Sequence, residues 1–199
     1  MYKRQTIDSM VFLEIKRKYE NHISKNRAPL LFSNLDNLLS TQDCEKYILK
    51  KKNYLDALKD ASNFFYFSKI KNYSPVVLVT YDREAYYSKH DSTLRITFDK
   101  NLRSIASPKT SDLYNEVSLK KAMQGNFILE LKFYSGFPQW LQKILQRFEL
   151  NRQAISKYTI CVDSHLELKR FTTKKNLLLP INYNNYKITD WKEVVKNAG

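Results

Sequence analysis

The stretch Leu94-Arg-Ile-Thr-Phe-Asp99 alternates strictly between apolar and polar residues, and Val11-Phe-Leu-Glu-Ile-Lys-Arg-Lys18 and Ile128-Leu-Glu-Leu-Lys-Phe133 nearly do the same. Because successive side chains of a β-strand point to opposite faces, each stretch predicts a strand with one apolar and one charged face. The charged faces would carry Glu14, Lys16 and Lys18, then Arg95, Thr97 and Asp99, then Glu130 and Lys132. One such strand is typical of a solvated sheet face. Several of them predict a sheet curled around a charged interior that holds a polyanion and a metal ion.

The charge balance favours partners rich in phosphate. The 199 residues, enough for one domain with a core, include 34 Lys and Arg against 20 Asp and Glu, a formal charge of +14. Such an excess attracts nucleic acid, nucleotides, polyphosphate or an anionic membrane surface, although it also serves solubility alone. We expect no nucleic-acid partner, because the basic residues alternate with core residues along strands instead of forming an outer stripe with exposed aromatics.

Glycine, cysteine and histidine usage excludes several kinds of site. Gly125, Gly136 and Gly199 are too few for a P-loop or a dinucleotide fingerprint, so phosphate would have to be bound by cationic side chains. Cys44 and Cys161 have neither metal-type nor disulfide-framework spacing, and the histidines are scattered, so a reducing, cytoplasmic location is expected. No apolar run approaches the ~18 residues of a membrane span, and we expect no signal peptide.

The order of elements predicts an α+β fold with mostly antiparallel strands. Turn residues, apolar periodicity and prolines place its elements. We expect strands at 11–18, 23–28 (ended by Pro29), 76–85, 93–99, 127–133 and 154–162. We expect helices within 35–60, with a cap at Ser40-Thr-Gln-Asp43, and at 138–149. Residues 62–72 would be irregular helix or loop, 104–124 a loop with one short strand or turn, and 163–199 a basic tail with a short helix near Trp191.

Five motifs in this order resemble the VTC domain, the polyphosphate polymerase domain of the vacuolar transporter chaperone complex and its bacterial relatives. They are Phe12-Leu-Glu-Ile-Lys-Arg-Lys-Tyr19, Tyr81-Asp-Arg-Glu-Ala-Tyr86, Leu94–Asp99, Ile128–Lys132 with Pro138-Gln-Trp-Leu141, and Ile155-Ser-Lys-Tyr158. The resemblance implies membership of the triphosphate tunnel metalloenzyme (CYTH-like) superfamily. It implies a β-tunnel with flanking helices, in which the terminal phosphate of ATP is transferred to a polyphosphate chain.

The resemblance covers residues 11–162 and implies an incomplete domain. The family has further strands upstream, whereas residues 1–10 fit nothing in its pattern and are expected to be a non-native start. A tunnel lacking those strands would leave unpaired edges. The chain alone would then be inactive, or a non-catalytic polyanion-binding module; a triphosphatase of the same fold is the other alternative.

Matched positions imply the roles of single residues. Lys16, Arg83, Arg95 and Lys157 would be catalytic cations, and Glu130 would bind Mn²⁺ or Mg²⁺, which prefer oxygen ligands. Phosphate would also contact Lys18, Lys25, Arg27, Tyr81, Lys132 and Ser156. Glu14 would pair with a neighbouring cation or, alternatively, bind metal. Ala154 departs from the fungal pattern, which has a lysine there. Expected partners are ATP or another triphosphate, polyphosphate and a membrane protein that threads the product.

Overall fold

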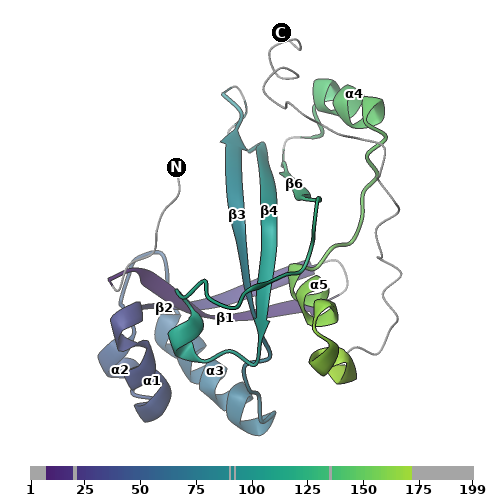
Figure 1. Ribbon diagram of the computed structural model, residues 1–199. Helices are drawn as coiled ribbons and strands as arrows, with labels where there is room; N and C mark the ends of the chain where they lie inside the picture. The colour runs from purple at the N-terminus through teal and green to yellow at the C-terminus, as the bar shows by residue number, and fades with distance from the viewer. Residues whose placement is uncertain (1–7, 20–21, 90, 92, 135, 172–199) are drawn as a thin grey trace.

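The computed structural model describes residues 8–19, 22–89, 91, 93–134 and 136–171 (Figure 1). Most of the expected tail, including the helix predicted near Trp191, lies outside these residues. The strands are β1 (Met10–Tyr19), β2 (His22–Leu31), β3 (Val77–Tyr87), β4 (Arg95–Ala106), β5 (Lys120–Lys121) and β6 (Ile128–Lys132). The α-helices are α1 (Leu35–Thr41), α2 (Cys44–Tyr47), α3 (Ala57–Ile70), α4 (Gln139–Arg147) and α5 (Lys157–Ser164). Short 3-10 helices lie at Phe32–Asn34, Thr110–Asp112 and Leu166–Phe171.

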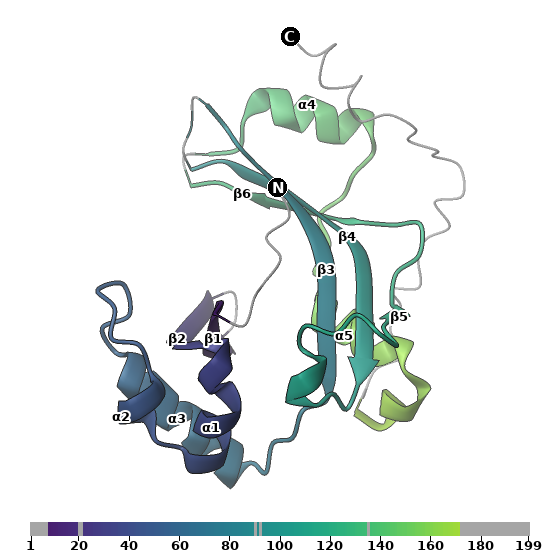
Figure 2. The same cartoon turned by 60° about the vertical axis from the view of Figure 1, so that its left-hand side comes forward.

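The first half of the molecule is a β-hairpin packed on helices (Figures 1 and 2). Strands β1 and β2 pair antiparallel along their whole length, from Met10 opposite Leu31 to Tyr19 opposite His22. The apolar face of the hairpin joins α1, α3 and the segment between them in one core, because side chains two apart on a strand share a face. The buried residues of this core are Leu13, Ala28, Leu30, Leu35, Leu38, Ile48, Ala57 and Ala61.

The second half is an antiparallel sheet in which β4 pairs with β3, β5 and β6. Helix α5 lies along the lower part of β3 and β4, and α4 lies at the opposite end beside β6 (Figure 2). A hydrogen bond of 2.9 Å between Ser104 Oγ and His165 Nε2 fixes the end of α5 to β4. Apolar residues buried in this half include Leu94, Leu102, Ile128, Leu141, Cys161 and Val162.

The α+β class and the antiparallel pairing are confirmed, but the sheets are not closed into a tunnel. Within the described residues, the hairpin and the larger sheet are separate and open, with no strand-to-strand hydrogen bonding between them. Strands β1 and β2 pair only with each other there, so each has an edge that pairs with no further strand. No helix in this part of the chain combines the length and the apolar character needed to cross a membrane.

Several predicted boundaries were wrong, for local reasons. Strand β2 continues through Pro29 to Leu31, because a strand edge tolerates the missing N–H of proline. Residues 62–70 belong to the regular helix α3. Strand β4 runs past the predicted end at residue 99 to Ala106, through an irregularity of register opposite Thr80 and Asp82. The predicted cap is confirmed, since Asp43 Oδ1 accepts a hydrogen bond of 3.1 Å from the Lys46 N–H at the start of α2.

The strand predicted at 154–162 is a helix. Residues rich in β-branched side chains favour a strand by propensity, as in Tyr158-Thr-Ile-Cys-Val162. The structure instead forms α5, where the Ser156 side chain accepts a hydrogen bond of 3.3 Å from the Thr159 N–H and caps the helix. The consecutive residues Cys161 and Val162 are both buried. In a strand of a sheet with one buried face, consecutive side chains point to opposite sides, and only one of the two would be buried.

Candidate functional site

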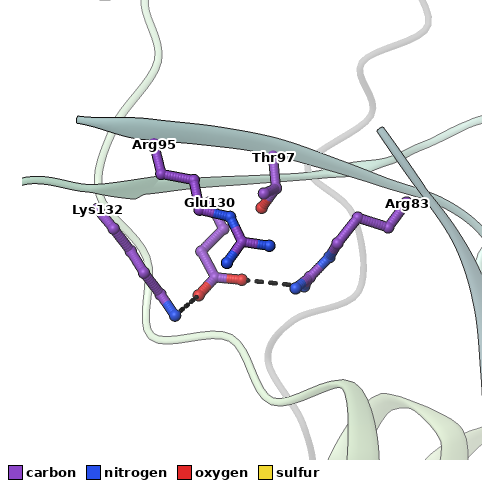
Figure 3. Close-up of a pocket in the computed structure, with 5 residues that line it drawn as sticks. All are labelled: Arg83, Arg95, Thr97, Glu130 and Lys132. Carbon is purple, nitrogen blue, oxygen red and sulfur yellow. Dashed lines mark hydrogen bonds and ion pairs between the residues drawn. The ribbon is translucent and has the colours of Figure 1, made fainter. Parts of the chain in front are cut away.

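Charged side chains from three neighbouring strands meet on one face of the larger sheet. The register places Arg83 opposite Asp99, Thr97 opposite Glu130, and Arg95 opposite Lys132. Because paired residues point to the same side of a sheet, these six side chains share a face. Figure 3 shows a hollow on this face, lined by Arg83, Arg95, Thr97, Glu130 and Lys132. We call this surface, together with Tyr81 and Lys157, the cationic face.

Helix α5 covers part of the same face because β4 is irregular. Asn101 has a left-handed backbone (φ 51°), and between Thr80 and Asp82 the pairing on β4 shifts by one residue. This bulge changes the alternation, so that Leu102 and Ser104 follow Thr97 and Asp99 as buried residues. Ser104 contacts His165 at the end of α5, so the polar face is partly shielded from water rather than fully solvated.

Asp99 is the deepest charged group of the cationic face, with a side chain only 1% exposed. Its carboxylate accepts hydrogen bonds from Arg83 Nε (2.5 Å) and Nη2 (2.7 Å) and pairs with Lys157 Nζ at 2.6 Å. Burial raises the pKa of Asp99, but the hydrogen bonds from Arg83 and Lys157 outweigh it and hold the pKa below its ordinary value. The hydrogen bond with Asp99 in turn raises the pKa of Arg83, so both groups stay charged.

Glu130 bridges two cations at the open side of the hollow. Its Oε2 accepts a hydrogen bond of 3.1 Å from Arg83 Nη2, and its Oε1 lies 3.2 Å from Lys132 Nζ. Burial raises the pKa of Glu130, but the hydrogen bond from Lys132 and the charges of Lys132, Arg83 and Lys157 outweigh it, so the net shift is downward. The carboxylate is 33% exposed, so it can be reached from solvent.

Aromatic rings flank the cations. The ring of Tyr81 lies 5.2 Å from the Arg83 guanidinium carbon and 5.0 Å from Lys157 Nζ. The ring of Tyr87 lies 5.4 Å from the guanidinium carbon of Arg95. Such contacts orient a cation without neutralising it. Two carboxylates thus face four cations, which leaves two positive charges for an anionic ligand.

The family of the chain follows from a sequence comparison. The model of the VTC domain matches residues 1–166. The chain belongs to the VTC domain family. Polyphosphate and nucleotide handling fit this membership, and they fit a face with excess positive charge. A search of curated proteins found no match.

The VTC domain brings together six of the residues predicted from its sequence and leaves the others elsewhere. Those on the cationic face are Tyr81, Arg83, Arg95, Glu130, Lys132 and Lys157. Ser156 caps α5 instead of lying on a strand with Lys157, so its hydroxyl has a structural use. Lys157 nevertheless reaches Asp99, because it is the first residue of that helix.

The remaining predicted cations lie on the hairpin. Lys16 is directly opposite Lys25, both exposed, and Arg27 pairs with Glu14 at 2.5 Å across the strands. Lys18 lies opposite Ile23 on the same hairpin. Where the structure describes both parts, no hydrogen bond or ion pair joins these hairpin residues to the cationic face. The VTC domain thus presents two cationic surfaces, one on each half.

A divalent metal fits the cationic face only when oxygens from a ligand complete its shell. Across the described residues, no group of three or more His, Cys, Asp or Glu side chains is placed to hold an ion. Glu130 and Asp99 are the carboxylates available, and Asp99 is fully engaged by Arg83 and Lys157. Glu130 is therefore the residue that would hold Mn²⁺ or Mg²⁺, with phosphate and water oxygens as further ligands.

Sequence reasoning gave no role to Thr97 or Asp99, two central residues of this face. Both stand at alternate positions after Arg95, so the spacing itself signalled that they share its face. Their importance depends on burial, at 2% exposure each, and burial follows from the neighbouring strands and α5.

Proposed function

We propose that this VTC domain is a phosphotransferase that binds ATP and polyphosphate on the cationic face and transfers the γ-phosphate to the polyphosphate chain. The observation that carries the proposal is the excess of positive charge on a partly covered sheet face, with arginines already oriented by carboxylates. With this reaction we also propose a cytoplasmic site of action and a membrane-protein partner that takes up the product.

The chemistry needs alignment and charge stabilisation more than a covalent catalyst. A terminal oxygen of polyphosphate attacks the γ-phosphorus of ATP, the bond to the β,γ-bridging oxygen breaks, and ADP leaves. Arg83 is held by Asp99 through Nε and Nη2, and its other edge, formed by Nη1 and the second N–H of Nη2, can turn from Glu130 to phosphate oxygens. Arg95, Lys132 and Lys157 would distribute the remaining charge along the chain. Mn²⁺ or Mg²⁺, when held at Glu130, would supply further neutralisation of the transferred group.

The first experiment measures the thermal stability of the domain with and without tripolyphosphate and Mn²⁺. A ligand that binds only the folded state stabilises it by about 2.7 kcal/mol at a hundredfold excess over its dissociation constant. We expect a clear rise in the wild type and its loss in Arg95→Glu. The matched control is Lys100→Glu, because Lys100 lies on the same strand and pairs with Glu84 outside the hollow. An equal loss in both variants, or no rise in the wild type, would contradict the proposal.

Product analysis distinguishes the alternatives. With ATP and polyphosphate, a polymerase lengthens the chain and a triphosphatase releases inorganic phosphate. A non-catalytic polyanion-binding module does neither while still binding tripolyphosphate, and the open sheets of the described residues favour this second candidate. A single-stranded oligonucleotide at equal phosphate concentration should give no comparable stabilisation.

A further inference from the structure

The floor of the hollow contains two buried hydrogen-bonding atoms without a partner. Thr97 is 2% exposed, and its Oγ1 makes no hydrogen bond within the described part of the chain. The same holds for Nε of Arg95. Both residues come from β4 and line the hollow below Glu130, and Figure 3 shows the Thr97 side chain pointing into the space between Arg95 and Arg83.

An unpartnered hydroxyl at this position costs stability. A buried donor or acceptor without a hydrogen bond costs about 1–3 kcal/mol, and valine has the same shape as threonine without that cost. The hydroxyl oxygen is buried from solvent, so bulk water does not satisfy it in this arrangement. A ligand that brings oxygen atoms into the hollow would accept hydrogen bonds from both the Thr97 hydroxyl and Arg95 Nε.

The route to these donors passes Glu130. Its carboxylate spans the hollow between Arg83 and Lys132 and, unlike the buried carboxylate of Asp99, is partly exposed. A phosphate group can take over both cations, because it offers several oxygens and more negative charge than a carboxylate. When the Glu130 carboxylate has moved out of the hollow, the phosphate can reach Thr97 Oγ1 and Arg95 Nε.

We propose that Thr97 Oγ1 and Arg95 Nε form a phosphate subsite, in which each donates a hydrogen bond to oxygens of one phosphate group of the bound triphosphate. This inference rests on the proposed function and adds Thr97 as a ligand-contacting residue. The hydroxyl donates to an unprotonated phosphate oxygen, while the guanidinium supplies both a donor and charge. Valine at position 97 would preserve the fold and remove the hydrogen bond to the ligand.

The test compares Thr97→Val, Thr97→Ser and the wild type in calorimetric titrations with tripolyphosphate, together with their melting temperatures without ligand. The control is Thr80→Val, since Thr80 Oγ1 is also buried without a partner but lies outside the hollow. We expect Thr97→Val to melt no lower than the wild type without ligand and to bind tripolyphosphate about tenfold more weakly, the loss expected for a hydrogen bond to a charged group. Thr97→Ser should bind like the wild type, and Thr80→Val should also retain full affinity.

The outcomes separate this inference from the proposed function. If the wild type binds tripolyphosphate and Thr97→Val binds it equally well, the subsite is wrong while the proposed function stands. If the wild type does not bind, both are wrong. A lower melting temperature of Thr97→Val without ligand would also overturn the subsite, because it would show that the hydroxyl has a structural partner. A failure of Thr97→Val to fold would overturn the subsite for the same reason.

Discussion

The same tripeptide pattern, Glu-x-Lys, stands in both halves of the molecule and acquires different surroundings in each. Glu14 and Lys16 lie on β1, while Glu130 and Lys132 lie on β6. The two carboxylates are almost equally exposed, at 32% and 33% of the side chain. Exposure of the glutamate therefore does not distinguish the two surfaces, and the difference must come from what lies beside it.

Within the described residues the hairpin has two strands, so its charged face has few neighbours. Glu14 pairs with Arg27, and Lys16 faces Lys25 directly. On the larger sheet, β3 and β4 add Arg83, Arg95 and the buried Asp99, and α5 adds Lys157. A third strand and a helix thus convert a charged face into a network, because buried charges are retained only when counterions are within contact.

The largest expected effect is that of Asp99→Asn. The substitution removes the carboxylate that holds Arg83 and Lys157, and breaking such a buried arrangement costs about 3 kcal/mol. Urea denaturation at neutral pH measures the change in the free energy of unfolding. The control is Asp82→Asn on the neighbouring strand, whose ion pair with Arg103 is more exposed and should contribute about 1 kcal/mol or less. Equal losses in the two variants would show that the network has no special role in stability.

The pH dependence of the free energy of unfolding tests the same charge network, with a smaller expected effect. The folded-state pKa values of Asp99 and Glu130 are lowered, so their contribution is complete above the unfolded-state pKa of about 4 and is lost as the pH falls further. The free energy of unfolding of the wild type should therefore decline below about pH 4. Asp99→Asn should decline less steeply, since one of the two groups no longer titrates. Parallel curves for the wild type and Asp99→Asn over this range would show that Asp99 does not contribute to the loss of stability at low pH.

The smallest effect is expected on the hairpin. Like charges directly opposite each other in antiparallel strands are destabilising, and opposite charges contribute about 0.2–1 kcal/mol. Lys25→Glu should therefore raise the free energy of unfolding by about 0.5 kcal/mol at low salt, because it would face Lys16. Lys25→Gln, which removes only the repulsion, should give a smaller gain. Both gains should shrink in about 1 M salt. A loss of stability in Lys25→Glu would mean that the two lysines are not opposed as the register places them.

Strand positions and faces were the most predictable features of the chain. The predicted alternation of Arg95, Thr97 and Asp99 and of Glu130 and Lys132 is present in β4 and β6, because side-chain period in a strand is a local property. Helix α5 was not predictable in this way. Its β-branched residues favour a strand, and burial of Cys161 and Val162 with capping by Ser156 overrides that preference.

The sequence by itself determined which residues are cationic, which of them share a face of a strand, and that no glycine loop would bind phosphate. The pairing of strands decided which of those faces became a site. Only through the register of β4 with β3 and β6 do Arg83, Asp99 and Glu130 meet, although they are 16 to 47 residues apart in the chain. Side-chain direction depends on neighbouring residues, whereas burial and counterions depend on strands and helices brought together from distant parts of the chain.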